Sequence, residues 1–479
     1  MGFALVAEDR LDDALWALRQ SFDHGADGPR LWRVFGNVLR LKGEIDAAIS
    51  AYREALRRQP DRLTHSRLLL AVNSSCTLTP AEVAQEHRHW ASLYAAPACV
   101  PVSAPRAVHG HKTPLVVGYV SPDFRSHPVA YFFLPLVEGH HRENVQVVCY
   151  ASTSANDGVR RRIAAAADLW REVAGWSTQR VVEQIRADGV DLLVDLAGHT
   201  TGNRLDVFAC RAAPVQLTYL GYPNTTGLDS IDYRLVDAVT DPPGPADELA
   251  SETLIRLEPG FLVFDPPADA PPVAQSPMLS NGYVTFGSFN KVAKLSPETL
   301  ETWSALLNKL PTARLLLKSG GLTTDESRNQ LCEAFAKAGL SDVSRLELRD
   351  LEPSRRAHLA MYGEIDIALD PFPYNGTTTT CQALWMGVPM ITLAGRSHAG
   401  RVGASLFSQM QLQALVAPDR ESYLRIAVGL AASPEKLADL RRGLRDRMAA
   451  SPLLDHVGFV ARLEALYRRL WQRACQAGA

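Results

Sequence analysis

The fold is indicated by the run Val190-Asp191-Leu192-Leu193-Val194-Asp195-Leu196, which is almost entirely apolar. A short apolar run of this kind is typical of a parallel strand that is buried on both faces of a sheet. The runs 115–120 and 145–150 have the same character, and helical stretches at 158–167 and 178–188 alternate with the three runs. Such alternation predicts a doubly wound α/β domain, in which ligands bind beyond the carboxyl ends of the strands.

A second series of strands and helices follows a connector rich in proline and alanine at 265–277. Its strand candidates are 282–289, 313–318, 345–348, 365–370 and 388–393. The last stretch, 434–471, is predicted to be one amphipathic helix. We therefore expect two Rossmann-like domains, 114–264 and 278–479, that face each other across a cleft.

Residues near the start of the chain repeat with a period of 34 positions. The first copy includes Gly2 and Leu5, and the second carries Trp32, Phe35, Gly36, Leu39, Gly43, Ala48, Tyr52, Ala55 and Pro60. This pattern resembles a tetratricopeptide repeat (TPR), which is a pair of antiparallel helices. We therefore expect TPR-like helices at 1–62 and a helical linker at 63–113. The helices are either a cap packed on the next domain or the remnant of a protein-docking arm.

The composition excludes several classes of protein. The 479 residues carry a formal net charge of −2, so we expect neither a nucleic acid nor a membrane as partner. No run of about 18 apolar residues is present, and the start Met1–Val6 lacks the basic region of a signal peptide. These features predict a cytoplasmic protein. The cysteines form no cluster with histidine, which predicts no metal site, and neither α/β half contains a dinucleotide or P-loop glycine motif.

The most informative chemical pattern is Asn375-Gly376-Thr377-Thr378-Thr379-Thr380, which lies between an apolar strand and a helix. Free backbone N–H groups at a helix start form an anion site, and threonine hydroxyls add donors without adding charge. A diphosphate is the expected occupant. The alternative is a β-branched helix cap without a ligand.

Two lysines follow the strand that ends near residue 289, and both precede a helix. Lys294, and with it Lys291, can neutralise the charge on a departing phosphate. The alternative is that they are solvated loop lysines. In the first half, the segment 118–128 follows the first strand and contains Asp123 and His127. His127 is a candidate to take a proton from an acceptor hydroxyl, although a structural histidine is the simpler interpretation.

Two further polar segments follow strands of the first half. One contains Asp195 and His199, and the other contains Tyr222 and Pro223. Loops at strand ends commonly contact ligands, so these residues are candidates for the acceptor side of the cleft. Turn formation alone is the alternative reason for their composition. Asp195 and Asp123 are the fallback candidates for a general base.

Taken together, these segments resemble the catalytic region of protein O-linked N-acetylglucosamine transferases, and most of all the SPINDLY branch. The likeness runs from about residue 115 to the end and is carried by the strings 211–216, 221–223 and 375–380. It implies a GT-B architecture and an inverting protein O-glycosyltransferase that needs no metal or cofactor. It also implies a nucleotide sugar held mainly by the C-terminal half, and protein acceptors docked through the TPR-like segment.

The resemblance also implies roles for single residues. His127 matches the active-site histidine of the family, and Lys294 matches the lysine that contacts the donor diphosphate. His358 matches a donor-site histidine near the nucleotide. Thr378 and Thr379 match the pair at the helix that binds the diphosphate.

Three positions depart from the N-acetylglucosamine transferases. Thr377 replaces a histidine, Gln382 replaces an aspartate that engages the nucleotide sugar, and Lys291 replaces a glutamine. The SPINDLY branch has threonine at the first of these positions, and its plant members are similar to protein O-fucosyltransferases. Both UDP-GlcNAc and GDP-fucose therefore stay open as the co-substrate. Two other functions also stay open: a non-catalytic scaffold with a degenerate transferase domain, and a GT-B enzyme that acts on a small molecule or glycan.

Overall fold

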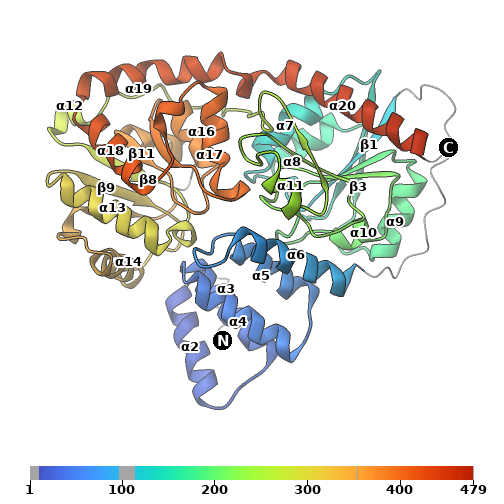
Figure 1. Cartoon of the computed structure of the whole chain (residues 1–479), viewed down its shortest axis with the longest axis horizontal. Coiled ribbons are helices and arrows are strands. Elements are labelled where there is room, and N and C mark those ends of the chain that lie inside the picture. The colour runs from blue at the N-terminus through green and yellow to red at the C-terminus, as the bar shows by residue number, and fades with distance from the viewer. Residues whose placement is uncertain (1–9, 96–113, 353, 478–479) are drawn as a thin grey trace. The chain divides into compact units, whose positions relative to one another are not determined.

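The computed structural model describes residues 10–95, 114–352 and 354–477 (Figure 1). Predictions for Gly2, Leu5, Met1–Val6 and the linker beyond residue 95 therefore lie outside the described residues. The chain forms two compact units. The C-terminal α/β unit takes its described residues from Met1–Leu78 and Pro266–Ser451, and the N-terminal α/β unit takes them from Thr79–Asp265 and Pro452–Ala479. The border near Asp265 falls at the start of the predicted connector.

The N-terminal α/β unit contains a parallel sheet of seven strands in the order β3-β2-β1-β4-β5-β6-β7. The strands are β1 (Leu115–Ser121), β2 (Val145–Ala151), β3 (Leu169–Glu172), β4 (Leu192–Asp195), β5 (Val215–Thr218), β6 (Tyr233–Val236) and β7 (Thr253–Arg256). Every residue of β1 and β4 is buried, as expected for central parallel strands covered on both faces. The order reverses beside β1, so the carboxyl end of β1 is a topological switch point.

Helices connect the strands of this unit and cover its sheet. They are α6 (Pro80–Tyr94), α7 (Ala130–Gly139), α8 (Gly158–Ala166), α9 (Thr178–Ala187), α10 (Leu205–Ala209), α11 (Pro245–Leu249) and α20 (His456–Ala477). The N-terminus of α6 has a capping box, in which Thr79 and Glu82 each satisfy a backbone N–H of the other.

The C-terminal α/β unit contains a parallel sheet of six strands in the order β10-β9-β8-β11-β12-β13. The strands are β8 (Thr285–Ser288), β9 (Arg314–Lys318), β10 (Leu346–Arg349), β11 (Ile367–Leu369), β12 (Met390–Leu393) and β13 (Val416–Ala417). The order again reverses at the inner strand β8. Both units are therefore Rossmann-like, and the predicted doubly wound α/β class is confirmed.

The helices of this sheet follow its strands in the usual alternation. They are α12 (Met278–Asn281), η1 (Val292–Lys294), α13 (Pro297–Lys309), α14 (Asp325–Lys337), η2 (Val343–Arg345), α15 (Arg355–Ala360), η3 (Met361–Glu364), α16 (Thr378–Trp385), η4 (His398–Gly400), α17 (Val402–Gln409), η5 (Gln413–Leu415), α18 (Arg420–Ala431) and α19 (Pro434–Ala449). Ser296 caps α13 by accepting a hydrogen bond from Thr299 N–H.

The prediction of one continuous helix over 434–471 is wrong. The chain leaves the helical path after α19, forms a short turn η6 (Pro452–Leu454) and begins α20 at His456. Pro452 disfavours a helical conformation of the residue before it, and Asp455 accepts a hydrogen bond from Gly458 N–H at the new start. The two helices belong to different units.

The N-terminal helices belong to the C-terminal α/β unit. They are α2 (Leu11–Asp23), α3 (Pro29–Leu41), α4 (Ile45–Arg58) and α5 (Arg62–Val72). Helices α3 and α4 pack so closely that a Cβ on Gly36 would lie 2.8 Å from the ring of Tyr52. The α3–α4 turn also touches the sheet's loops, because a Cβ on Gly43 would lie 3.2 Å from the carbonyl oxygen of Val292. These helices are thus part of the body that holds η1.

Candidate functional site

A buried carboxylate organises the loop that follows β11. Asp370 accepts hydrogen bonds from Gly376 N–H at 2.7 Å and from the Thr392 hydroxyl at 2.7 Å. Asn375, which is also buried, donates from its amide to the carbonyl of Pro371 at 3.0 Å. The loop therefore returns on itself and presents the start of α16 beyond the carboxyl end of the strand, where ligands bind in open α/β sheets.

The threonine run begins α16, and its hydroxyls differ in environment. Thr379 donates to the Asn290 amide oxygen at 2.9 Å, whereas Thr380 is fully buried and its hydroxyl has no partner among the described residues. Thr377 and Thr378 are half-buried, and neither hydroxyl makes a hydrogen bond to the part of the chain that the structure describes. These two hydroxyls and the first-turn N–H groups are thus available to a ligand.

Gly376 keeps the space in front of this helix start open. A Cβ at this position would lie 2.5 Å from the Thr379 hydroxyl oxygen, 2.9 Å from that of Thr380 and 3.1 Å from the Asn290 amide oxygen. Any side chain at residue 376 would therefore collide with the groups that line the turn. The arrangement fits a ligand that approaches the backbone closely, as phosphates do at helix starts.

Lys294 brings a positive charge to the same turn. Its ammonium donates to the carbonyl of Asn375 at 2.6 Å and lies 4.3 Å from the centre of the Tyr374 ring. Burial lowers the pKa of Lys294, and burial raises the pKa of Asp370 on the opposite side of the turn. Lys291, at the start of η1, is exposed. The predicted proximity of Lys294 to the threonine run is thus present in the structure.

A second group of predicted residues forms a chain of hydrogen bonds beside the run. His358 Nε2 donates to the Gln382 amide oxygen at 3.0 Å, and His358 Nδ1 accepts from the ammonium of Lys318. Burial and the charge of Lys318 lower the pKa of His358 to about 4, while burial lowers the pKa of Lys318 to about 8. His358 is therefore neutral at pH 7, and its ring lies 6.0 Å from that of Phe289.

Three residues of this region were missed from the sequence: Asn290, Lys318 and Asp370. Asn290 and Asp370 each come shortly after a strand, and Lys318 is the last residue of β9. Position at the carboxyl end of a parallel strand was the available signal. Their hydrogen-bond partners lie at very different distances along the chain. The partner of Asn290 is 89 positions away and that of Lys318 is 40 positions away, whereas Asp370 bonds residues 6 and 22 positions away.

The N-terminal α/β unit holds the predicted catalytic histidine. His127 follows β1 and is half-buried, and its Nδ1 accepts from Val129 N–H at 3.3 Å and lies 3.5 Å from a carboxylate oxygen of Asp123. Asp123 is buried, which raises the pKa of its carboxyl. The two residues therefore lie together at the carboxyl end of the central strand, as predicted for the segment that contains them.

Asp195 is held in place by three donors. It accepts from the Thr218 hydroxyl at 2.8 Å, from Gly198 N–H at 2.8 Å and from Ala197 N–H at 3.1 Å. The side chain is 1% exposed, and burial raises its pKa to about 6. Its oxygens are thus engaged in shaping the loop after β4.

His199 and Tyr222 lie in a buried cluster with α6. The Tyr222 hydroxyl donates to His87 Nε2 at 2.8 Å, and His199 Nε2 donates to the Thr226 carbonyl at 2.8 Å. The His199 ring packs edge-on against Trp90 at 4.6 Å. Pro223 beside Tyr222 is half-buried. The cluster fixes the two loops to each other, and its two predicted members lie in the interior.

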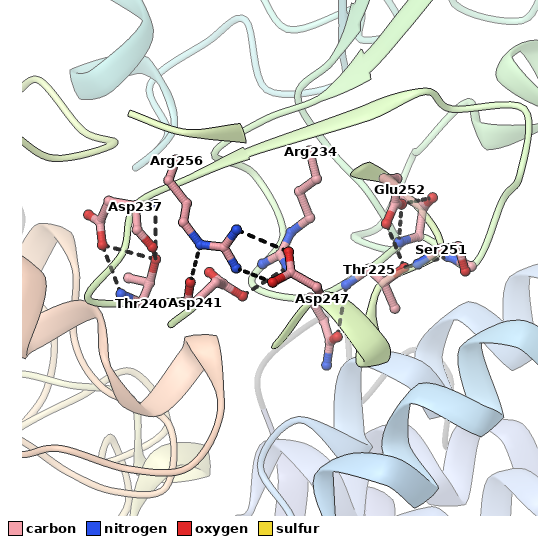
Figure 2. Close-up of polar contacts among 12 residues, drawn as sticks. Thr225, Arg234, Asp237, Thr240, Asp241, Asp247, Ser251, Glu252 and Arg256 are labelled. Carbon is pink, nitrogen blue, oxygen red and sulfur yellow. Dashed lines mark hydrogen bonds and ion pairs between the residues drawn. The ribbon is translucent and has the colours of Figure 1, made fainter. Parts of the chain in front are cut away.

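Ion pairs and hydrogen bonds stabilise the edge of the N-terminal sheet that β6 and β7 form (Figure 2). Glu252 accepts from the Thr225 hydroxyl at 2.6 Å, and Arg256 forms an ion pair with Asp247 at 2.9 Å. Arg234, which is buried, forms another with Asp241 at 3.2 Å. The loop that carries Tyr222 and Pro223 is thereby anchored at its far end as well.

A comparison with protein families assigns the chain. The model of glycosyl transferase family 41 matches residues 99–268 and 273–463. The chain belongs to glycosyl transferase family 41. The assignment confirms the predicted family and the GT-B fold, because both Rossmann-like sheets lie within the matched ranges.

Individual members of glycosyl transferase family 41 give the same result. The chain is 39% identical over 438 residues to a protein of Oryza sativa subsp. japonica named "Probable UDP-N-acetylglucosamine--peptide N-acetylglucosaminyltransferase SPINDLY", covering 90% of this chain and 47% of the relative. A protein of the same name from Solanum lycopersicum is 43% identical, covering 76% and 39%. The chain thus spans less than half the length of these curated relatives.

A solved structure, a mutant of the O-GlcNAc transferase of Thermobaculum terrenum, superposes on the chain with a TM-score of 0.93. The sequence identity is 38%, and the match covers 100% of this chain and 91% of that one. Within residues 10–95, 114–352 and 354–477, no helix has the length and apolar character needed to cross a bilayer. The same residues contain no cluster of three or more histidine, cysteine or acidic side chains arranged to hold a metal ion.

Proposed function

We propose that the chain transfers a sugar from a nucleoside diphosphate sugar to a serine or threonine hydroxyl of a protein, with inversion at the anomeric carbon. The observation that carries the proposal is the position of Lys294, whose ammonium lies at the turn from which the threonine run begins. A cation beside a helix start with free N–H groups is an arrangement suited to a diphosphate.

The leaving group determines what the site must do. In the transfer step the acceptor oxygen forms a bond to the anomeric carbon, and the bond from that carbon to the phosphate oxygen breaks. Negative charge then grows on the departing diphosphate. We assign its stabilisation to Lys294, to the hydroxyls of Thr377 and Thr378 and to the N–H groups of α16, all of which are in place before the bond breaks. Thr379 supports the helix start through its hydrogen bond to Asn290. Gly376 and Asn375 keep the turn open, and Lys291 adds a second positive charge.

The acceptor proton is assigned to the N-terminal α/β unit. His127 has an imidazole suited to orient or receive a proton near neutral pH, and Asp123 beside it can orient the ring. For Asp195, His199, Tyr222 and Pro223 we propose a supporting role in shaping the acceptor-side loops. The three hydrogen bonds to Asp195 and the burial of His199 and Tyr222 support that role.

The nucleotide end of the donor is assigned to the chain formed by Lys318, His358 and Gln382. These residues present one ammonium and two neutral hydrogen-bonding groups beside the ring of Phe289. The names of the plant relatives favour UDP-GlcNAc as donor, and the threonine at residue 377 keeps GDP-fucose as the second candidate. The acceptor is proposed to be a protein that docks through the N-terminal helices.

A thermal-shift series tests the donor assignment. The chain is melted with UDP, GDP, UDP-GlcNAc or GDP-fucose, and we expect one nucleotide to raise the melting temperature strongly, because a ligand that binds the folded state stabilises it by mass action. Incubation of proteins with the selected donor, followed by mass spectrometry, then identifies the sugar and the modified residue. The absence of any shift would contradict the proposal and favour a non-catalytic scaffold, and transfer to a small molecule alone would contradict the protein acceptor.

A further inference from the structure

One face of α3 carries positively charged and amide side chains. Arg33, Asn37 and Arg40 are four and three residues apart, so they lie along the same side of the helix. Arg67 of α5 and Lys291, the residue before η1, belong to segments that pack against α3. Four cations and one amide therefore gather around one side of α3, which we call the α3 basic face.

These cations are poorly compensated within the protein. The Nε atom of Arg40 is buried and has no acceptor among the residues that the structure describes. Arg67 and Lys291 make no hydrogen bond or ion pair with the described ranges of the chain, and Asp61 forms an ion pair with Arg33 at 3.9 Å. Like charges that are held together repel one another, so the face is complementary to an anionic partner.

Contacts within the C-terminal α/β unit join the α3 basic face to the segment that carries Lys294. The Tyr52 hydroxyl donates to the Asn37 amide oxygen at 2.9 Å, and the ammonium of Lys42 contacts both Asp12 and Gln330 of α14. The close approach of Gly43 to Val292 joins α3 to η1, which ends in Lys294. A polypeptide bound to the α3 basic face would therefore pass close to Lys294.

We propose that the α3 basic face, formed by Arg33, Asn37, Arg40, Arg67 and Lys291, docks an acidic segment of the polypeptide acceptor. The inference rests on the proposed transferase function and specifies its substrate: proteins with aspartate- or glutamate-rich sequence near the modified hydroxyl. Peptide is favoured over nucleic acid because Asn37 offers an amide to a peptide backbone, while none of the five residues is an aromatic on which a base would stack.

Binding of labelled peptides tests the proposal. One peptide carries glutamates around a single serine, and its partner carries glutamines at the same positions. We expect the full chain to bind the glutamate peptide more tightly in fluorescence anisotropy, and the difference to shrink between about 50 mM and about 300 mM salt. Arg40→Gln and Arg67→Gln should each weaken binding of the glutamate peptide about threefold to fivefold and leave the glutamine peptide unchanged.

The matched control is Arg57→Gln, because Arg57 is exposed on α4 and pairs with Glu54 outside the face. Unchanged binding of nucleoside diphosphate in calorimetry would establish that the Arg40 and Arg67 variants are folded, and the two variants lie on separate helices. Equal affinity for the two peptides, or no loss in either variant, would overturn the inference, as would tighter binding of an RNA oligonucleotide. Glutamate-selective binding without transfer to any peptide would instead contradict the transferase function and leave the docking surface standing.

Discussion

The ammonium of Lys294 donates a hydrogen bond to the main-chain carbonyl of Asn375 at 2.6 Å. Asn375 is followed by Gly376, which directly precedes the threonine run. Lys294 and Asn375 come from different loops of the sheet, which are 81 positions apart. A diphosphate bound at α16 would meet this ammonium at the moment when its negative charge grows. The contact thus joins the two halves of the anion site.

Replacing Lys294 by alanine should abolish most of the transfer and leave the fold intact. Loss of a preorganised charge at the leaving group costs about 100-fold to 1000-fold in turnover. A radiolabelled-donor assay measures the loss, and Lys309→Ala, at the exposed end of α13, is the control. Near-normal transfer by the Lys294 variant would remove the assigned role.

The pH dependence of transfer should reflect the buried state of Lys294. Because burial lowers its pKa, the free enzyme should lose the required positive charge at a lower pH than an ordinary lysine would. We therefore expect kcat/KM to fall on the alkaline side below the usual lysine range of about 10.4. A profile that stays flat up to that range would contradict the expectation.

The threonines should differ in their importance for donor binding. Thr378→Val removes a hydroxyl assigned to the diphosphate, and Thr379→Val removes the hydrogen bond that joins the helix start to Asn290. We therefore expect each variant to raise the dissociation constant of the nucleoside diphosphate about fivefold to tenfold. Thr380→Val has the same shape change but removes a buried hydroxyl without a partner. It should bind the nucleotide normally in calorimetry, and equal losses at all three positions would contradict the assignment.

A methyl group at residue 376 should close the turn. Gly376→Ala places a carbon 2.5 Å from the Thr379 hydroxyl, so the helix start must shift and the nucleotide should bind at least about tenfold more weakly. The exposed residue Gly429 has open space around it, and Gly429→Ala serves as control. Thermal-shift titration with the selected nucleotide measures both variants.

Removal of the charge of Lys318 should make His358 easier to protonate. Its pKa is about 4 because of burial and of that charge, and Lys318→Met removes the second cause. We expect the pKa of His358 to rise, and histidine C2–H exchange followed by mass spectrometry reports it residue by residue. An unchanged pKa of His358 would contradict the assigned effect of the Lys318 charge.

The stability of the N-terminal α/β unit should depend on Glu464 of α20. This carboxylate accepts from His140 Nδ1 at 3.1 Å, from His141 N–H at 2.8 Å and from the Asn144 amide at 3.0 Å. These hydrogen bonds lower its pKa to about 2 despite burial. A depressed carboxyl pKa stabilises the folded state above about pH 4.5, and the gain disappears as the pH falls toward about 2.

Glu464→Gln should therefore lower the melting temperature at neutral pH, by an amount that corresponds to on the order of 2 to 3 kcal/mol. The variant should also lose less stability than the parent between about pH 5 and about pH 3. Glu435→Gln on α19, where the side chain is exposed, is the matched control. If the melting temperatures of the parent and the Glu464 variant fell by the same amount between these pH values, the assignment would be contradicted.

The sequence predicted the long central strands well, because β1 and β4 are buried on both faces and their apolar runs are unmistakable. It missed β3, β7 and β13, which are short; no residue of β3 is fully buried and only one residue of β7 is, so the apolar pattern is weak. The break between α19 and α20 had a local signal in Pro452. The amphipathic pattern on both sides of Pro452 nevertheless favoured the prediction of a single helix.

The candidate site was predictable where its chemistry is local. The threonine run and Lys294 stand out as patterns within single segments, and the structure places them together. Asn290 could not be recognised in the same way, since its role depends on Thr379, 89 positions away. The role of Asp370 depends on its burial and on the turn that its carboxylate holds. His358 was identified by resemblance alone, and the contact that determines its protonation, with Lys318, joins residues 40 positions apart.

The assignment of the first helices to the C-terminal α/β unit has a practical consequence for protein engineering. The backbone passes from one unit to the other at 78–79, at 265–266 and at 451–452. A chimera that exchanges donor preference between two relatives must therefore transplant Met1–Leu78 together with Pro266–Ser451. A swap of the Rossmann half alone would leave α3 facing a foreign η1 and break the interface between Gly43 and Val292.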